Sequence, residues 1–138
     1  MSNSRAMLRE EFRIEELSEP ISHYTDAVRF GDLLFVSGVA PLDRSSRLVG
    51  KGDVVAQTQQ IFENLKHILD VADANFSDVL KVTVYMTDVE DRTKINPVRQ
   101  KYFGNARPAS TLIGVRALAI PDMKIEIEAV VGLRNGKA

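Results

Sequence analysis

Two carboxylates near the C-terminus have a spacing that could support chemistry. Glu126 and Glu128 alternate with apolar residues in the run KIEIEAVV, which is typical of a strand. Both side chains are therefore expected on one face, roughly 6.6–7 Å apart along the strand. A carboxylate within reach of a water can orient it and accept its proton, and two carboxylates at a partly dry surface raise the pKa of one of them. The alternative is two exposed charges paired with Lys or Arg.

The composition argues against several other kinds of site. The chain of 138 residues has no Cys, so a disulfide, a thiol nucleophile and a Cys-based metal site are excluded. Its two histidines, His23 and His67, are far apart, and a metal site is not expected. The 18 Lys and Arg against 19 Asp and Glu give no basic excess for nucleic acid. No apolar stretch approaches the length of a membrane span or a secretory signal, so we expect a cytoplasmic protein.

The first third of the chain is expected to form strands. FRIEEL is a candidate short strand. Ala27–Phe30 and Leu33–Ser37 are expected to form a hairpin, because the two turn-forming residues Gly31 and Asp32 separate two β-prone runs. Residues 1–10 are polar and are expected to be loose.

Helical periodicity appears twice. Between Asp53 and Ala72 apolar residues recur every three or four positions, which predicts a helix with Asp53 as its N-cap. A second helix is expected to begin near Asn96 and end at Phe103, because Pro97 is tolerated only in a first helical turn.

Three further strands complete the predicted sheet. VLKVTVYMTDV alternates between apolar and polar residues, and two more strands are expected over Ser110–Val115 and Met123–Val131. The order is two or three strands, a helix, a strand, a helix and two strands. It predicts one α+β domain over residues 1–138, with two helices packed on one face of a mixed sheet.

The second face of this sheet carries both polar and apolar side chains. In the last strand, Lys124, Glu126, Glu128 and Val130 alternate with the residues expected in the core. A semi-apolar sheet face is commonly buried by association, so a homo-oligomer is expected.

The chain as a whole resembles a known family. HYTDAVRFGDLLFVSGVAPLD, QTQQIFENLKHIL, VLKVTVYMTDVEDRTKINPVRQKYF, and RPAST followed by KIEIEAVV together resemble the RidA/YjgF family of reactive-intermediate deaminases, from about Tyr24 to Val131. The resemblance implies a chorismate-mutase-like fold and a homotrimer whose sheets face inward, with ligand clefts between adjacent subunits. It also implies hydrolysis of enamines and imines to 2-oxo acids and ammonia, with no metal or organic cofactor.

The same resemblance assigns roles to individual residues. Glu126, the first Glu of I-E-I-E-A, matches the family's catalytic-side glutamate. Ser37 and Gly38 match the small-residue wall of the cleft, although a strand end turning into a loop would use the same two residues. Tyr24 matches an aromatic residue near the cleft mouth, or else packs the N-terminal segment. Asn96 matches an asparagine at the start of the second helix, where helix capping is the favoured role.

Ser110 departs from the family pattern. Active deaminases of the family carry Arg directly after Pro-Ala, and its guanidinium binds the substrate carboxylate. A serine hydroxyl cannot replace that charge. Arg107 and Arg116 are nearby candidates for the missing charge, and the alternative for each is a solvated surface arginine. Ser110 and Thr111 are then expected to shape the pocket.

These features predict a cofactor-free hydrolase or deaminase acting on small reactive imines, enamines or related C–N compounds. Because of Ser110, the substrate is expected to differ from the simple 2-imino acids. The segment VRALAIPDM is about one residue longer than its family counterpart, which suits a changed substrate. The first alternative is a non-catalytic trimer that binds a small metabolite. A ribonuclease or translation inhibitor is a weaker alternative, because the chain lacks a basic, aromatic-interleaved stripe.

Overall fold

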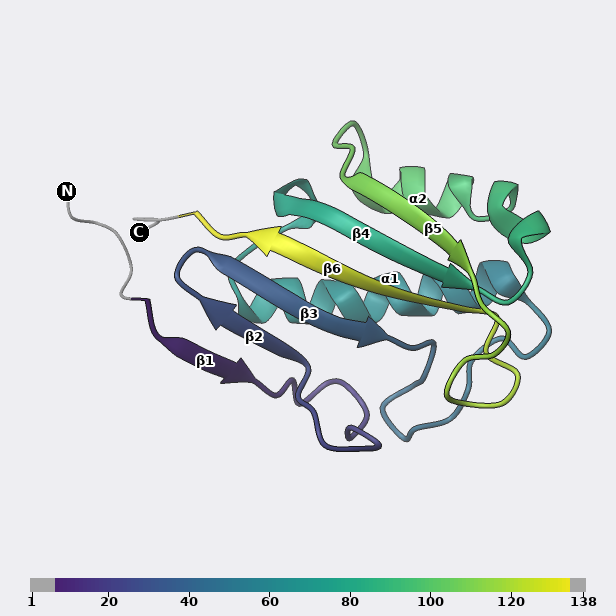
Figure 1. The fold of residues 1–138 in the computed structure, drawn as a ribbon, viewed down its shortest axis with the longest axis horizontal. Helices are drawn as coiled ribbons and strands as arrows, with labels where there is room; N and C mark the ends of the chain where they lie inside the picture. The colour runs from purple at the N-terminus through teal and green to yellow at the C-terminus, as the bar shows by residue number, and fades with distance from the viewer. Residues whose placement is uncertain (1–6, 135–138) are drawn as a thin grey trace.

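A six-stranded mixed sheet with two helices on one face forms the body of the protein (Figure 1). The computed structural model describes residues 7–134. The looseness expected for residues 1–6 lies outside the described residues. Arg9 and Glu10 were expected to be loose, but they belong to the first strand.

The first three strands form an antiparallel meander. They are β1 (Arg9–Phe12), β2 (Ala27–Phe30) and β3 (Leu33–Val39). The hairpin between β2 and β3 is confirmed, with Gly31 at a φ of 63° in its turn. β3 extends two residues beyond the expected end at Ser37.

The expected strand over FRIEEL is wrong. β1 ends at the Phe12 of that segment, because the chain then leaves the sheet. The backbone N–H of Ile14 donates to the Asp26 carboxylate at 2.7 Å instead of to a neighbouring strand, and the Ile14 side chain enters the core.

The long helix α1 (Val54–Val71) is confirmed together with its cap. The Asp53 side chain accepts hydrogen bonds from the N–H groups of Val55 and Ala56, at 3.1 Å each. No helix in residues 7–134 has both the length and the apolar character needed to cross a bilayer. The buried face of α1 carries apolar residues that pack against the sheet: Val54, Ile61, Phe62, Leu65, Ile68 and Leu69.

Three helices and three strands form the rest of the fold. They are the short 3₁₀ helices η1 (Phe76–Asp78) and η2 (Val89–Thr93), the helix α2 (Asn96–Phe103), and the strands β4 (Val79–Met86), β5 (Ala109–Gly114) and β6 (Ile125–Gly132). The strand order is β1-β2-β3-β6-β4-β5, and only β4 and β5 run parallel. The expected α+β arrangement is therefore confirmed. In Figure 1 both helices lie behind the sheet.

Helix α2 begins where its proline predicts, but it is not capped by Asn96. The N-cap is Ile95, without a side-chain capping bond, and Pro97 occupies the first turn. Asn96 is already helical, and its side chain is exposed. The expected capping role is therefore wrong, which leaves the Asn96 amide available for other contacts.

The two faces of the sheet differ sharply. Residues paired across neighbouring strands share a face, so Glu126 and its partner Tyr85, together with Glu128 and its partner Thr83, lie on the face opposite the helices. We call this the open face. Five large apolar side chains on it are each 40–50% exposed: Phe30, Leu33, Phe35, Leu80 and Ile113.

Candidate active site

A cavity of about 490 Å³ lies where the end of β3 meets the start of β6. We call it the main cavity. Its walls are the N-terminal segment 17–26, the end of β3 with the loop after it, and the loop that leads into β6. Its volume suits a small metabolite. Four residues assigned to the site from the sequence line it together: Tyr24, Ser37, Gly38 and Glu126.

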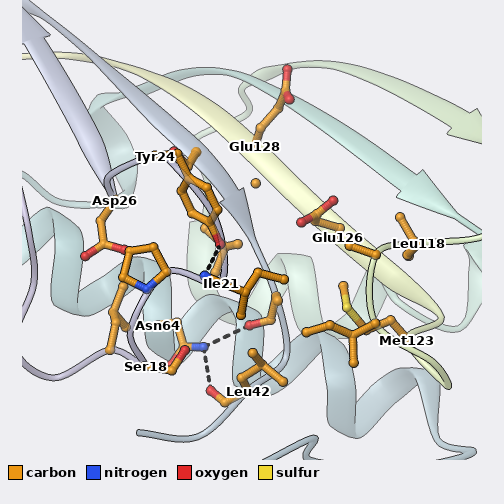
Figure 2. A pocket seen from close by; sticks show the side chains of 18 of the residues that line it. Ser18, Ile21, Tyr24, Asp26, Leu42, Asn64, Leu118, Met123, Glu126 and Glu128 are labelled. Carbon is orange, nitrogen blue, oxygen red and sulfur yellow. Dashed lines mark hydrogen bonds between the residues drawn. The ribbon is translucent and has the colours of Figure 1, made fainter. Parts of the chain in front are cut away.

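Glu126 lies directly over Gly38. A Cβ atom added to Gly38 would come within 2.8 Å of both Cδ and Oε2 of the Glu126 carboxylate. The backbone of Gly38 is not in the left-handed region, so glycine is required here by space alone. The missing side chain at this position therefore leaves room for the Glu126 carboxylate. Figure 2 shows the Glu126 carboxylate facing Tyr24 and Ile21 across the cavity.

The environment of Glu126 favours its protonated form. The side chain is half-buried, and burial raises the pKa of its carboxyl, with repulsion from Glu128 adding to the effect. Within residues 7–134, no group donates a hydrogen bond to Glu126, and neither glutamate forms an ion pair with Lys or Arg. Glu126 is thus a carboxylate open to water or a ligand.

Unlike Glu126, Glu128 is hydrogen-bonded to the hydroxyl of Tyr85. Burial raises the pKa of the Tyr85 hydroxyl, and the neighbouring Glu128 raises it further by charge and by hydrogen bonding. Glu128 also lines the main cavity, but in Figure 2 its carboxylate points away from the end that holds Met123. The two glutamates on one strand therefore differ in their freedom to act.

Ser37 and Tyr24 shape the wall beside Glu126. The Ser37 hydroxyl donates to the carbonyl of Thr25 at 2.6 Å, which joins β3 to the N-terminal segment. The Tyr24 hydroxyl accepts from the N–H of Ile21 at 3.3 Å and keeps its own hydrogen free to donate. Tyr24 is 49% exposed and lines the cavity.

An arginine that the sequence reasoning missed holds this wall in place. Arg13 Nη1 lies 2.7 Å from the Asp26 carboxylate, and its Nη2 donates to the carbonyls of Leu17 and Ser18 at 3.3 and 2.9 Å. Asp26 is buried and lines the cavity. Nothing in the local sequence pattern distinguishes Arg13 from an exposed strand charge.

Two buried amides of α1 hold the other walls. Asn64 Nδ2 donates to two carbonyls of the segment that follows β3, each at 3.0 Å. Gln57 donates to the carbonyl of Asp122 at 3.0 Å and accepts from the N–H of Lys124 at 2.7 Å. The two amides are seven residues apart in the apolar stripe of α1, and that spacing is a sequence signal that could have found them.

Four residues assigned to the site from the sequence do not line the main cavity: Asn96, Ser110, Thr111 and Arg116. Ser110 is paired with the buried Val82, so it faces the helices, where its hydroxyl accepts from Arg99 Nη2 at 3.0 Å. Thr111 lies on the open face and accepts from Lys81 Nζ at 2.8 Å. Arg116 is exposed in the loop between β5 and β6.

A second pocket, of about 600 Å³, lies between the end of α2 and the start of β5. We call it the α2–β5 pocket. Asn96 and Arg107 line it, and so does Arg99, which the sequence reasoning did not select. Arg99 lies three residues after Asn96, close to one helical turn, so the two are expected on one side of α2.

The arrangement in the main cavity offers proton transfer to and from water. A half-buried carboxylate of raised pKa that has no hydrogen-bond or ion-pair partner among residues 7–134 and faces a tyrosine is suited to act as a general base and then as a general acid. Within residues 7–134, no three His, Cys, Asp or Glu side chains converge as metal ligands would.

Comparison with known proteins identifies relatives along almost the whole chain. The family model described as endoribonuclease L-PSP matches residues 15–132. A RutC family protein of Pyrococcus abyssi is 40% identical over 124 residues, which cover 90% of this chain and 97% of that protein. The 3-aminoacrylate deaminase RutC of Acinetobacter baylyi is 37% identical over 111 residues, which cover 80% of this chain and 87% of that enzyme.

Solved structures agree with the sequence relatives. The crystal structure of the YjgF gene product from E. coli is similar with a TM-score of 0.82 at 29% identity, covering 91% of this chain and 99% of that one. The family model, the sequence relatives and the solved structure therefore agree over most of the chain. This protein belongs to the RidA/YjgF family.

Proposed function

We propose that this protein is a homotrimeric hydrolase that deaminates small imines, enamines or related C–N compounds without a cofactor. One observation carries the proposal: Glu126 presents a half-buried carboxylate of raised pKa to a small cavity, with no partner among the described residues. The similarity to a relative named 3-aminoacrylate deaminase supports the same reaction class.

In the proposed reaction, Glu126 moves one proton. It accepts a proton from water as the water oxygen bonds to the carbon of a protonated imine, and the C=N π electrons pass to nitrogen. It then returns the proton to that nitrogen. The C–N bond breaks and ammonia leaves as the hydroxyl of the adduct gives its proton to bulk water and the carbonyl forms. An enamine enters the same path after protonation at carbon. Protonated imines are already electrophilic, so positioning and one proton-transfer group supply the catalysis.

The proposed trimer brings two separated parts of the chain together. Asn96, Ser110 and Thr111 lie outside the main cavity of their own chain, at the β5 edge of the sheet. The open face exposes five large apolar side chains, an arrangement that favours burial against other subunits. We place the β5 edge of one subunit at the main cavity of the next.

The proposed substrate differs from the simple 2-imino acids. Position 110 offers a neutral hydroxyl that is already hydrogen-bonded to Arg99, so β5 itself supplies no positive charge for a carboxylate. A ligand bound as 2-imino acids are bound by arginine-bearing members would lack its counter-charge there.

The test is a deamination assay on a panel of imines. Imino acids are generated with an amino-acid oxidase, 3-aminoacrylate and a neutral imine are added to the panel, and ammonia release is followed. We expect Glu126→Gln to lower kcat/KM by about 100-fold or more, because the proton-transfer group is lost. Ser110→Arg is expected to raise activity on 2-imino acids. Full activity of Glu126→Gln on every substrate would rule out the proposed role.

A second candidate is a trimer that binds a metabolite without turning it over, and it is favoured by the serine at position 110. It predicts a co-purified small molecule, detectable by mass spectrometry, that Glu126→Gln retains, with no turnover anywhere in the panel. RNA binding is the weaker alternative, given the net charge of −1. Salt-dependent binding of RNA by the purified protein would revive it.

A further inference from the structure

Arg99 carries a partly buried positive charge that no carboxylate within residues 7–134 neutralises. Its Nη2 donates to Ser110 Oγ at 3.0 Å, which is a neutral partner. Burial lowers the pKa of its guanidinium, and no acidic side chain among the described residues acts to raise it. Charges taken partly out of water are normally paired, because desolvation disfavours an isolated ion. The missing partner is therefore expected to come from outside this chain.

The surroundings of Arg99 are suited to an anion. The α2–β5 pocket is also lined by Arg107 and by the amide-bearing residues Asn96, Gln100 and Asn105, and no Asp or Glu lines it. Arg107 makes no ion pair within residues 7–134, so two arginines face one pocket without counter-charge. Guanidinium groups only donate hydrogen bonds, and amides can turn their NH₂ groups toward an acceptor.

The hydrogen bond to Ser110 leaves most of the Arg99 guanidinium available. Of its five N–H groups, one is used by the serine hydroxyl. The others can still form the two parallel bonds that a carboxylate accepts from arginine. Ser110 therefore acts as a positioning residue, because it limits where the guanidinium lies.

We propose that Arg99, positioned by Ser110 and assisted by Arg107, binds the carboxylate of the substrate. The inference rests on the proposed function, in which the β5 edge of one subunit completes the cleft of the next. It also names the substrate class, an imine or enamine that carries a carboxylate. Because the positive charge comes from α2 and not from residue 110 of β5, the carboxylate and the C–N bond are spaced differently from those of a 2-imino acid.

A binding experiment tests Arg99 without requiring turnover. The probe is 3-hydroxypropanoate, a small stable acid whose oxygen-bearing carbon lies one carbon farther from the carboxylate than in a 2-oxo acid, titrated into the full chain by calorimetry or NMR. We expect Arg99→Gln to weaken binding by about 10-fold or more, since it removes a charge-assisted bidentate contact. Arg99→Lys is expected to recover only part of the affinity, because the ammonium keeps the charge but not the fork.

Matched variants separate this role from a general change in charge. Lys101→Gln removes one positive charge from an exposed position of the same helix and is expected to leave binding unchanged. Ser110→Ala is expected to weaken binding by a smaller factor, and Ser110→Thr, which keeps the hydroxyl, to restore it. Wild-type affinity in Arg99→Gln, equal loss in Lys101→Gln, or no carboxylate binding by the wild type would each overturn the proposal.

Steady-state kinetics test the proposed anion site and the proposed deamination separately. With Arg99→Gln, KM is expected to rise more for a carboxylate-bearing imine than for a neutral imine, by a ratio of about 10 or more. If the wild type hydrolyses no imine but Arg99→Gln still weakens the binding of 3-hydroxypropanoate, the proposed reaction fails and the anion site stands. If the wild type is an active deaminase and both substrates lose equally, the anion site fails and the reaction stands.

Discussion

At the scale of single residues, two glutamates on one strand are set up for different tasks. Gly38 leaves the space that lets the Glu126 carboxylate lie over β3, and burial then raises its pKa. Glu128, two residues away, is engaged by the Tyr85 hydroxyl. The difference arises from the neighbours of each carboxylate, because their local sequences are nearly the same. We therefore assign proton transfer to Glu126 and a tuning role to Glu128.

The pH dependence of the reaction follows from this arrangement. Glu126 accepts a proton as a carboxylate, so kcat/KM is expected to rise with pH through its pKa, which lies above the ordinary 4.5. Glu128→Gln removes the second cause of the raised pKa and is expected to move the acid limb to lower pH, while the amide oxygen still accepts from Tyr85. Profiles of kcat/KM between about pH 4 and 8 measure this. An unmoved acid limb would contradict the coupling of the two glutamates.

The same shift predicts the effect on stability. A raised carboxyl pKa means that the folded state holds its proton more tightly than the unfolded chain. The Glu126 contribution to the free energy of unfolding is therefore present at low pH and is lost as pH rises through the folded pKa. Urea unfolding should find Glu126→Gln at least as stable as the wild type at neutral pH, with the difference shrinking toward pH 4.

At the scale of elements, the main cavity depends on side chains that hold three loops. Asn64 and Gln57 of α1 bind the backbone of the segments after β3 and before β6. Arg13 and Asp26 hold the N-terminal wall. Each contact satisfies backbone groups that would otherwise be partly buried without partners. The strands thus place Glu126, and these polar contacts give the cavity its shape.

Arg13→Gln tests whether Arg13 holds the N-terminal wall of the main cavity. Arg13→Gln leaves the buried Asp26 without its ion pair and releases the carbonyls of Leu17 and Ser18. We expect a loss of about 1–3 kcal/mol in the free energy of unfolding, together with a higher KM, because a wall of the cavity loosens. Urea unfolding and steady-state kinetics measure the two effects.

Arg9→Gln is the matched control for Arg13. Arg9 lies four residues earlier and pairs with Glu11 on the surface, where the two side chains are 63% and 56% exposed. Its loss is expected to cost less than about 1 kcal/mol and to leave KM unchanged. Equal effects of the two substitutions would contradict a positioning role for Arg13.

At the scale of the whole molecule, the open face of the sheet is the surface through which we propose that subunits associate. Its exposed apolar side chains lie on strands on both sides of β6, the strand that carries Glu126 and Glu128. A monomer would leave these side chains in water and would keep the α2–β5 pocket apart from the main cavity. The proposed association would therefore serve both stability and the assembly of the proposed cleft.

Phe35→Glu tests the proposed trimer. Phe35 is 49% exposed on the open face, and a charge there would have to be desolvated in the interface. We expect the mass in solution to fall from three times 15.4 kDa to 15.4 kDa, with loss of deaminase activity. Light scattering coupled to gel filtration measures the mass.

The control places the same charge on the helix side. Val71 is 56% exposed at the end of α1, so Val71→Glu adds a carboxylate outside the open face and is expected to keep the wild-type mass. A monomeric wild type, or a Phe35→Glu variant that stays trimeric, would contradict the proposed association.

Much of the fold could be predicted from the sequence because its signals are local. The three-four spacing after Asp53, the position of Pro97 and the alternation around Glu126 each depend on residues within a few turns or one strand. They placed α1, α2 and the last strand within one or two residues. The prediction for FRIEEL failed because the N–H of Ile14 donates to the carboxylate of Asp26, a contact between two segments that local patterns do not report.

For the candidate site too, local features could be predicted from the sequence and contacts between elements could not. The sequence by itself determined the strand that carries Glu126, the small residues Ser37 and Gly38 at the end of another strand, and the neutral residue at position 110. The tertiary structure alone decided that Gly38 lies beneath the Glu126 carboxylate and that Arg99 reaches Ser110. Periodicity reports which face a residue occupies within its own element. Contacts between elements depend on strand register and loop paths, and these are decided only when the whole chain packs.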